Sequence, residues 1–109
     1  MEIVFDKIPV EAVPHMRDGQ GAVSLQKASD GKVKVMKGIL PAGATIGLHT
    51  HDTSSEVIYI LAGAGKVLCD GVYEPLAPGA CHYCPKGHAH SLINDSDQDL
   101  AFFAVVPEQ

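Results

Sequence analysis

The chain has 109 residues, of which 46% are apolar and 19% charged, a composition typical of one globular domain rather than of a disordered tail. Its formal net charge is -5 and its eight lysines and arginines are scattered, which argues against nucleic acid or an anionic membrane surface as a partner. No apolar stretch approaches the roughly 20 residues of a membrane-spanning helix.

The first residues and the cysteines together indicate a cytoplasmic location. Residues 1–7 contain neither the basic stretch nor the apolar stretch of a secretory signal. The cysteines at positions 69, 81 and 84 are an odd number, which suits reduced thiols rather than a disulfide framework. We therefore expect a cytoplasmic protein.

Residues 1–21 predict a short N-terminal segment made of an edge strand and a loop. Residues 2–5 are compatible with the edge strand, and Pro9 and Pro14 interrupt the pattern that follows. Residues 15–21 contain aspartate and two glycines, which are typical of a turn or loop. This segment is expected to precede the main domain.

Residues 22–107 predict a single β domain. Apolar residues alternate with polar ones, and the pairs Asp30-Gly31, Asp70-Gly71 and Pro78-Gly79 mark turns. No stretch shows a helical period with caps. The expected strands include residues 23–26, 33–40, 56–61, 66–69, 72–74, 80–84, 88–93 and 100–106. About eight to ten short strands of this kind indicate an all-β barrel or sandwich.

Histidines at positions 49 and 51, with Glu56 close behind, are the first candidate site. If His49 and His51 lie on an extended strand, their spacing of two places both imidazoles on one face. Glu56 then begins the next apolar run. Two imidazoles and a carboxylate on facing strands are typical ligands of a transition metal, and such a site usually needs a fourth ligand.

These residues and a second group further along resemble the two motifs of the cupin superfamily. The first motif is a glycine, five residues, His-x-His, a glutamate and a closing glycine, which this chain matches at Gly43, His49, His51, Glu56 and Gly63. The second is a glycine, five residues, Pro-x-Gly, a histidine and an asparagine, matched at Gly79, Pro85, Gly87, His90 and Asn94. One position differs, because Ala80 stands where cupins usually carry aspartate, a turn position at which we expect no effect on metal binding.

The resemblance implies a jelly-roll barrel, or double-stranded β-helix, in which His49, His51, Glu56 and His90 hold one divalent transition metal. Three imidazoles and one carboxylate accept Mn, Fe, Ni, Zn, Cu or Co, so the metal stays undecided among these. In an octahedral arrangement two positions stay open, which suits catalysis. The resemblance also implies a homodimer, and the apolar character of both faces of the strands agrees with it.

The fold hosts many chemistries, so the function stays open between two classes. The first is a metal-dependent enzyme acting on a small polar or anionic metabolite, with dioxygenase-like chemistry favoured over isomerase or lyase chemistry. The second is a non-catalytic module that binds or senses a small ligand such as a sugar. No catalytic residue beyond the metal ligands can be named from the sequence.

The segment Cys81-His82-Tyr83-Cys84 invites a zinc or redox interpretation through its Cys-x-x-Cys spacing. On a strand, a separation of three places the two thiols on opposite faces, so we expect structural cysteines. His82 and Cys84 share a face, which leaves a thiol near the metal pocket as the alternative. His88 is expected to be a solvated loop residue, with a substrate contact at the barrel mouth as its alternative.

Overall fold

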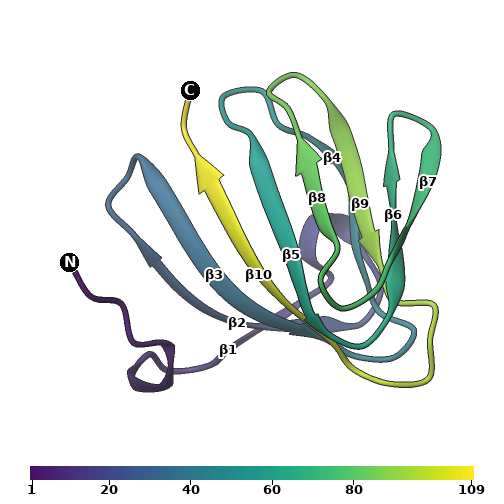
Figure 1. Ribbon diagram of the computed structural model, residues 1–109, viewed down its shortest axis with the longest axis horizontal. Helices are drawn as coiled ribbons and strands as arrows, with labels where there is room; N and C mark the ends of the chain where they lie inside the picture. The colour runs from purple at the N-terminus through teal and green to yellow at the C-terminus, as the bar shows by residue number, and fades with distance from the viewer.

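Two antiparallel sheets packed face to face make up the protein, as the computed structural model shows for all residues 1–109 (Figure 1). The six-stranded sheet has the order β1-β2-β3-β10-β5-β8, and the four-stranded sheet has the order β4-β9-β6-β7. This is a jelly-roll barrel, as the sequence predicts. In chain order the elements are the 3₁₀ helix η1 (Phe5–Lys7), β1 (Glu11–Pro14), the 3₁₀ helix η2 (Met16–Asp18), β2 (Ala22–Ser29), β3 (Val33–Leu40), β4 (Thr45–Thr50), β5 (Glu56–Ala62), β6 (Gly65–Cys69), β7 (Val72–Leu76), β8 (Cys81–Cys84), β9 (Ala89–Ile93) and β10 (Leu100–Pro107).

Neither helix is long and apolar enough to cross a membrane.

The predicted alternation along the strands separates the core from the surface. On β10, Leu100, Phe102 and Ala104 are buried, while the residues between them are partly exposed. The inward side chains of both sheets join in one apolar cluster, to which β3 contributes Leu40 and β9 contributes Leu92. Burial of this alternating set is the main force that holds the two sheets together.

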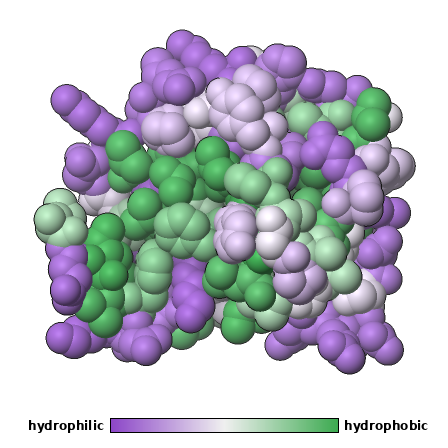
Figure 2. Space-filling model, viewed as in Figure 1, coloured by the Kyte–Doolittle hydropathy of each residue, from purple (hydrophilic) through white to green (hydrophobic).

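The outer face of the six-stranded sheet also carries apolar side chains. Ile39, Tyr59, Leu61 and Tyr83 are each more than a third exposed, on β3, β5 and β8. Figure 2 shows apolar side chains gathered on the face of the molecule that is seen in Figure 1. An apolar outer sheet face of this kind is a surface that a second protein chain can cover.

The start of the N-terminal segment differs from its prediction. The edge strand expected at residues 2–5 is wrong, because Phe5 begins η1 and the edge strand is β1, which pairs with β2. The Gln26 side-chain amide donates to the carbonyls of Phe5 and Ile8 at 2.8 and 3.0 Å, which holds the turn. The Phe5 ring packs edge-to-face on Phe103, with centroids 6.1 Å apart. These distant contacts decide the local conformation.

Residues 15–21, predicted as a loop, contain the short helix η2, which lies against β4. Figure 1 shows the N-terminal segment running along β2 before it reaches the four-stranded sheet. It therefore brings η2 to the side of the barrel where His49 lies.

Candidate metal centre

Pairing between strands gathers the four residues that the sequence singled out. His49 on β4 lies directly opposite His90 on β9 in the ladder of the four-stranded sheet. Glu56 begins β5 in the other sheet, and His51 follows the end of β4. The His51 backbone is held by two hydrogen bonds to the turn before β9, from its N–H to the His88 carbonyl and from the Gly87 N–H to its own carbonyl, at 3.0 and 2.7 Å.

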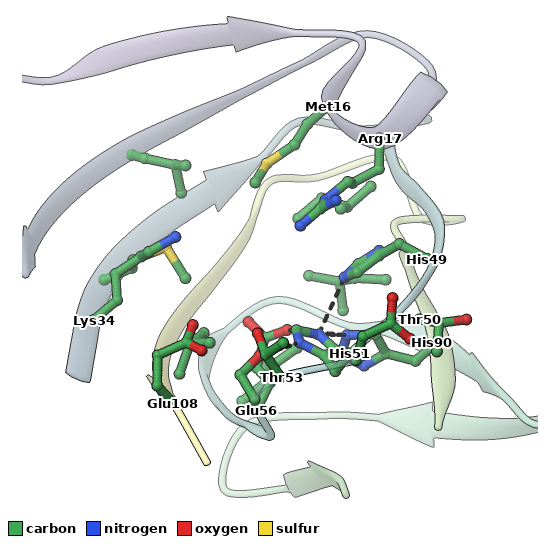
Figure 3. A pocket seen from close by; sticks show the side chains of 18 of the residues that line it. Met16, Arg17, Lys34, His49, Thr50, His51, Thr53, Glu56, His90 and Glu108 are labelled. Atoms are coloured by element: carbon green, nitrogen blue, oxygen red, sulfur yellow. Dashed lines mark hydrogen bonds and ion pairs between the residues drawn. The ribbon is translucent and has the colours of Figure 1, made fainter. Parts of the chain in front are cut away.

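The ligand-type atoms of these four residues all lie within 4.8 Å of one another, so they form a group that could hold a metal ion (Figure 3). The His51 Nε2 atom lies 3.2 Å from the His49 Nε2, 2.9 Å from the His90 Nε2 and 3.1 Å from a Glu56 carboxylate oxygen. The same Glu56 oxygen lies 2.9 Å from the His90 Nε2. His51, Glu56 and His90 are buried, and His49 is partly exposed.

Hydrogen bonds on the outer side of the imidazoles orient them toward this point. The His49 Nδ1 lies 2.7 Å from the Gly47 carbonyl oxygen, which can only accept, so Nδ1 carries the proton and Nε2 presents its lone pair. The His51 Nδ1 lies 3.0 Å from the Ser54 hydroxyl. Such outer partners are the usual means by which proteins fix metal-binding histidines. The donor set of this structure therefore fits a divalent metal.

The electrostatics of the group suit a cation. Burial by itself would raise the pKa of the Glu56 carboxyl, but its contacts with the His51 and His90 imidazoles outweigh burial and lower the pKa to about 2. Burial lowers the pKa of His49, and the neighbouring charges of His90, His51 and Arg17 act in the same direction. An ionised carboxylate at Glu56 and a lowered pKa at His49 both favour the binding of a cation, because a metal displaces protons from its ligands.

A pocket of about 350 Å³ lies beside the group, and it has cationic side chains that belong to neither sequence motif. Arg17 of η2 and Lys34 of β3 both line it. Figure 3 shows Arg17 on the far side of His49 from Glu56, with Lys34 on another wall. Its apolar lining includes Met36, Ile46, Ile58, Leu92 and Phe102. Sequence reasoning missed both cations, because no local pattern connects residues 17 and 34 to the histidines.

A strained turn places Arg17 at this pocket. His15, Arg17 and Asp18 all adopt positive φ angles, of 50, 54 and 63°, which is costly for residues other than glycine. The turn can approach β4 because Gly47 lies in an irregular part of the ladder with β9 and has no side chain. A Cβ atom built at Gly47 would lie 1.8 Å from the Arg17 carbonyl oxygen.

The cysteines behave as the strand geometry predicts. Cys81 is exposed and Cys84 is buried, on opposite faces of β8. His82 and Cys84 do share a face, and with Cys69 they form a second group whose ligand-type atoms lie within 4.8 Å. Both nitrogens of His82 are already bonded to other side chains, and burial raises the pKa of the Cys84 thiol to about 12. We therefore retain the structural interpretation of this second group.

Thiol alkylation provides a direct check of this interpretation. At pH 8, iodoacetamide is expected to add one group to the folded protein, at Cys81, because burial also raises the pKa of Cys69 and the thiolate is the reactive form. Intact-mass spectrometry and peptide mapping measure the result, with the protein unfolded in urea as the control that reacts at all three cysteines. Modification of Cys69 or Cys84 in the folded protein would contradict the prediction.

His88 lies outside the four-residue group, in the turn before β9. Its side chain is about half exposed and forms an ion pair with Asp70, so the prediction of a solvated loop histidine fits its position. The hydrogen bond from His88, with one from the Ala89 N–H, lowers the pKa of the Asp70 carboxyl. Asn94 is buried and its side-chain oxygen accepts from the Ser96 backbone N–H at 3.0 Å, which stabilises the turn after β9.

Comparisons with known proteins agree with this fold. A family described as "Cupin domain" matches residues 36–106. The oxalate-binding protein of Thermotoga maritima is 31% identical to this chain, over 97% of this chain and 93% of the relative. A crystal structure described as a predicted oxalate decarboxylase, also from Thermotoga maritima, superposes with a TM-score of 0.93 at 30% identity over the whole of both chains. A sugar phosphate isomerase of the cupin superfamily from Silicibacter pomeroyi superposes with a TM-score of 0.79 at 24% identity, covering 100% of this chain and 76% of that one.

Proposed function

This chain belongs to the cupin family, and on that premise we propose that it binds one divalent transition metal and, at that metal, a small dianionic carboxylic acid of about the size of oxalate. His49, His51, Glu56 and His90 are the proposed metal ligands. The observation that carries the proposal is the convergence of these four donors beside a pocket that Arg17 and Lys34 also line.

The donor set decides the kind of metal and the charge that it retains. Nitrogen and carboxylate donors suit Mn, Fe, Ni, Zn, Cu or Co, and one carboxylate leaves a divalent ion with a net charge of about +1. Such a metal would supply a Lewis acid with open positions at which an anion can bind. The chain's own contribution is to hold three imidazoles and one carboxylate at one point before the metal arrives.

The pocket favours a small anion over a neutral sugar. Arg17 and Lys34 add two positive charges to its lining, which also contains the exposed carboxylates of Asp52 and Glu108. The guanidinium group of an arginine can bind a carboxylate in a bidentate manner. The apolar side chains of Met36, Ile58 and Phe102 form part of its wall and limit its volume. The Thermotoga relative is named for oxalate binding, which supports the same class of ligand. The likeness to the sugar phosphate isomerase concerns the fold alone.

Metal-dependent catalysis, with dioxygenase-like chemistry ahead of isomerase or lyase chemistry, is the second candidate. The open positions of a six-coordinate metal favour it. The pocket holds no buried ionisable side chain beyond the four proposed ligands, since Asp52 and Glu108 are exposed. Any reaction would therefore depend on the metal rather than on a separate buried general base. The homodimer and the cytoplasmic location stay predictions, and the apolar outer face of the six-stranded sheet supports the first of them.

Calorimetric titration of oxalate into the metal-loaded protein tests the proposal. We expect binding that disappears when a chelator removes the metal, and an affinity for acetate that is much weaker because acetate carries a single carboxylate. Substituting Arg17→Gln should lower oxalate affinity about tenfold, since a hydrogen bond to a charged group contributes about 1.5–3 kcal/mol, while metal content stays unchanged.

The matched control is Lys32→Gln, which removes an exposed positive charge outside the pocket and should leave oxalate affinity unchanged. Equal oxalate binding with and without metal would contradict the proposal. Assays of dioxygen uptake and of oxalate consumption on the same samples separate the catalytic candidate from binding alone, because binding without turnover in every metal form would exclude the enzyme.

A further inference from the structure

A buried histidine that neither motif includes lies directly behind the proposed ligand His90. His82 on β8 is 2% exposed, and its Nε2 atom lies 3.0 Å from the His90 Nδ1 atom. On its other side, the His82 Nδ1 lies 2.9 Å from a carboxylate oxygen of Glu74, which is on β7. The three side chains therefore form one continuous hydrogen-bonded row from the candidate metal centre to the half-exposed carboxylate of Glu74.

The direction of the donors in this row follows from the acceptor at its outer end. An ionised carboxylate only accepts, so the His82 Nδ1 carries a proton and donates to Glu74. In a neutral imidazole the other nitrogen then accepts, so the His82 Nε2 receives a hydrogen bond from the Nδ1–H of His90. His90 is left with an unprotonated Nε2, which is the atom that faces His51 and Glu56. This is the tautomer that can bind a metal.

We propose that His82 and Glu74 are positioning residues of the metal centre, which hold the His90 ring in the orientation and the tautomer that bind the ion. This inference rests on the proposed metal-binding function. It follows the general pattern in which a metal-bound imidazole donates its second N–H to a fixed acceptor, so that the ring keeps one orientation and presents its other nitrogen to the metal.

The placement of the row in the barrel explains why it is rigid. β7 and β8 are edge strands of the two different sheets, so the Glu74–His82 pair connects the sheets at an edge where no backbone ladder joins them. His90 is on β9, inside the four-stranded sheet, paired with His49 on one side and with Cys69 on the other. Any shift between the two sheets would therefore change the His82–His90 distance.

The alternative to positioning is a buried histidine that merely fills the core with its hydrogen bonds satisfied. That role predicts a loss of folding stability in a His82 variant, with metal affinity unchanged once the protein is folded. Positioning predicts a loss of metal affinity and a change in the protonation site of His90, even in variants that keep their stability. The two roles can therefore be distinguished, because a core-filling role changes folding stability alone and a positioning role changes metal affinity and the protonation site of His90.

The experiment compares three variants with the wild type, using Zn²⁺ affinity from competition with a chelating dye. His82→Phe keeps an aromatic ring but removes both nitrogens, and Glu74→Leu removes the outer acceptor. Loss of such an outer partner typically costs 10–100-fold in metal affinity, so we expect a 10–100-fold loss in His82→Phe and a smaller but measurable loss in Glu74→Leu. Glu74→Gln is the conservative variant, because its amide oxygen still accepts from His82, and it should stay within about threefold of the wild type.

Long-range ¹H–¹⁵N correlation spectra of the histidine rings, recorded without metal, provide the second measurement. We expect His90 to be protonated at Nδ1 in the wild type and in Glu74→Gln, and to populate both tautomers in His82→Phe and Glu74→Leu. Thermal unfolding of each apoprotein separates effects on stability from effects on metal affinity. If His82→Phe does not fold, the metal affinity and the ring spectra of Glu74→Leu still distinguish positioning from a purely structural role.

A wild-type His90 protonated at Nε2, or variants with wild-type affinity, would overturn the inference. A wild type that binds no metal at all would instead contradict the proposed function. The ring spectra of the apoprotein would still show which nitrogen of His90 is protonated.

Discussion

Replacing His51 by alanine is expected to abolish stoichiometric metal binding. His51 is the central member of the group, since its Nε2 lies within 3.2 Å of a ligand-type atom of each of the other three residues. Its loss removes one of four donors and opens the buried centre to water. We expect at least a 100-fold lower affinity, about 2.7 kcal/mol, measured as metal content by mass spectrometry after dialysis and as Zn²⁺ affinity by dye competition.

His88→Ala is the matched control, because it removes a histidine from the adjacent turn that belongs to no metal group. It should retain the full metal content. Glu56→Gln is a further variant in which the volume stays and only the negative charge is lost, and it should also lose metal, since a cation in a buried site requires a charged partner. Full metal content in His51→Ala would contradict the assignment of the centre.

Replacing Gly47 by alanine is expected to have the second largest effect, on stability and on ligand binding together. The new Cβ would lie 1.8 Å from the Arg17 carbonyl oxygen, so η2 and its arginine would have to move away from β4. Overlap in a well-packed site typically costs 1–3 kcal/mol, and contact with backbone favours the upper end. We expect a loss of about 3 kcal/mol, or roughly 10–20 °C in Tm for a domain of this size.

The functional part of this prediction is a loss of oxalate affinity of about tenfold or more, similar to that of Arg17→Gln. Metal content should be retained, because alanine keeps the backbone carbonyl that accepts from His49 Nδ1 and no proposed metal ligand lies on η2. Calorimetry measures both quantities. Leu48→Ala serves as the control, since Leu48 is the next residue on β4 and is 60% exposed. Surface changes of this kind usually stay within about 0.5 kcal/mol. A Gly47→Ala variant with the Tm and oxalate affinity of the wild type would show that η2 does not position Arg17.

The two effects separate two layers of the site. The inner layer consists of four donors that the barrel holds through strand pairing, with His49 and His90 opposed in one ladder and Glu56 on the facing sheet. The outer layer consists of Arg17 and Lys34, which come from the N-terminal segment and from β3. Variants of the inner layer should lose metal and ligand together, whereas variants of the outer layer should lose ligand alone.

Local patterns in the sequence predicted an all-β barrel or sandwich, and the resemblance of two motifs to the cupin superfamily implied the jelly roll and the inner layer. Period-two alternation and turn pairs such as Asp70-Gly71 specify which strands form and which of their faces are buried, and the structure confirms the all-β jelly roll. The spacing of two between His49 and His51 and the position of His90 in a second motif predicted one group, and the structure brings these residues together with Glu56. The same alternation placed Cys81 and Cys84 on opposite faces, as observed.

Other features depend on contacts between residues far apart in the chain, which no local pattern contains. The edge strand expected at residues 2–5 is wrong because Gln26 and Phe103 hold Phe5 in a turn, and both of these partners lie on other strands. Arg17 reaches the pocket only because η2 packs on Gly47, some 30 residues later in the chain. Glu74 and His82 meet only because the edges of the two sheets close on each other.

By itself, therefore, the sequence determined the strands and turns of an all-β domain, since alternation acts within a strand and its turns, and its resemblance to the cupin superfamily implied the jelly roll and the group of four candidate metal ligands. Only the tertiary structure decided what surrounds that group, namely the two cations of the pocket lining and the His82–Glu74 row beside His90. The physical reason is that these partners are brought together by the pairing and closure of the sheets, which depend on the whole chain rather than on any one segment.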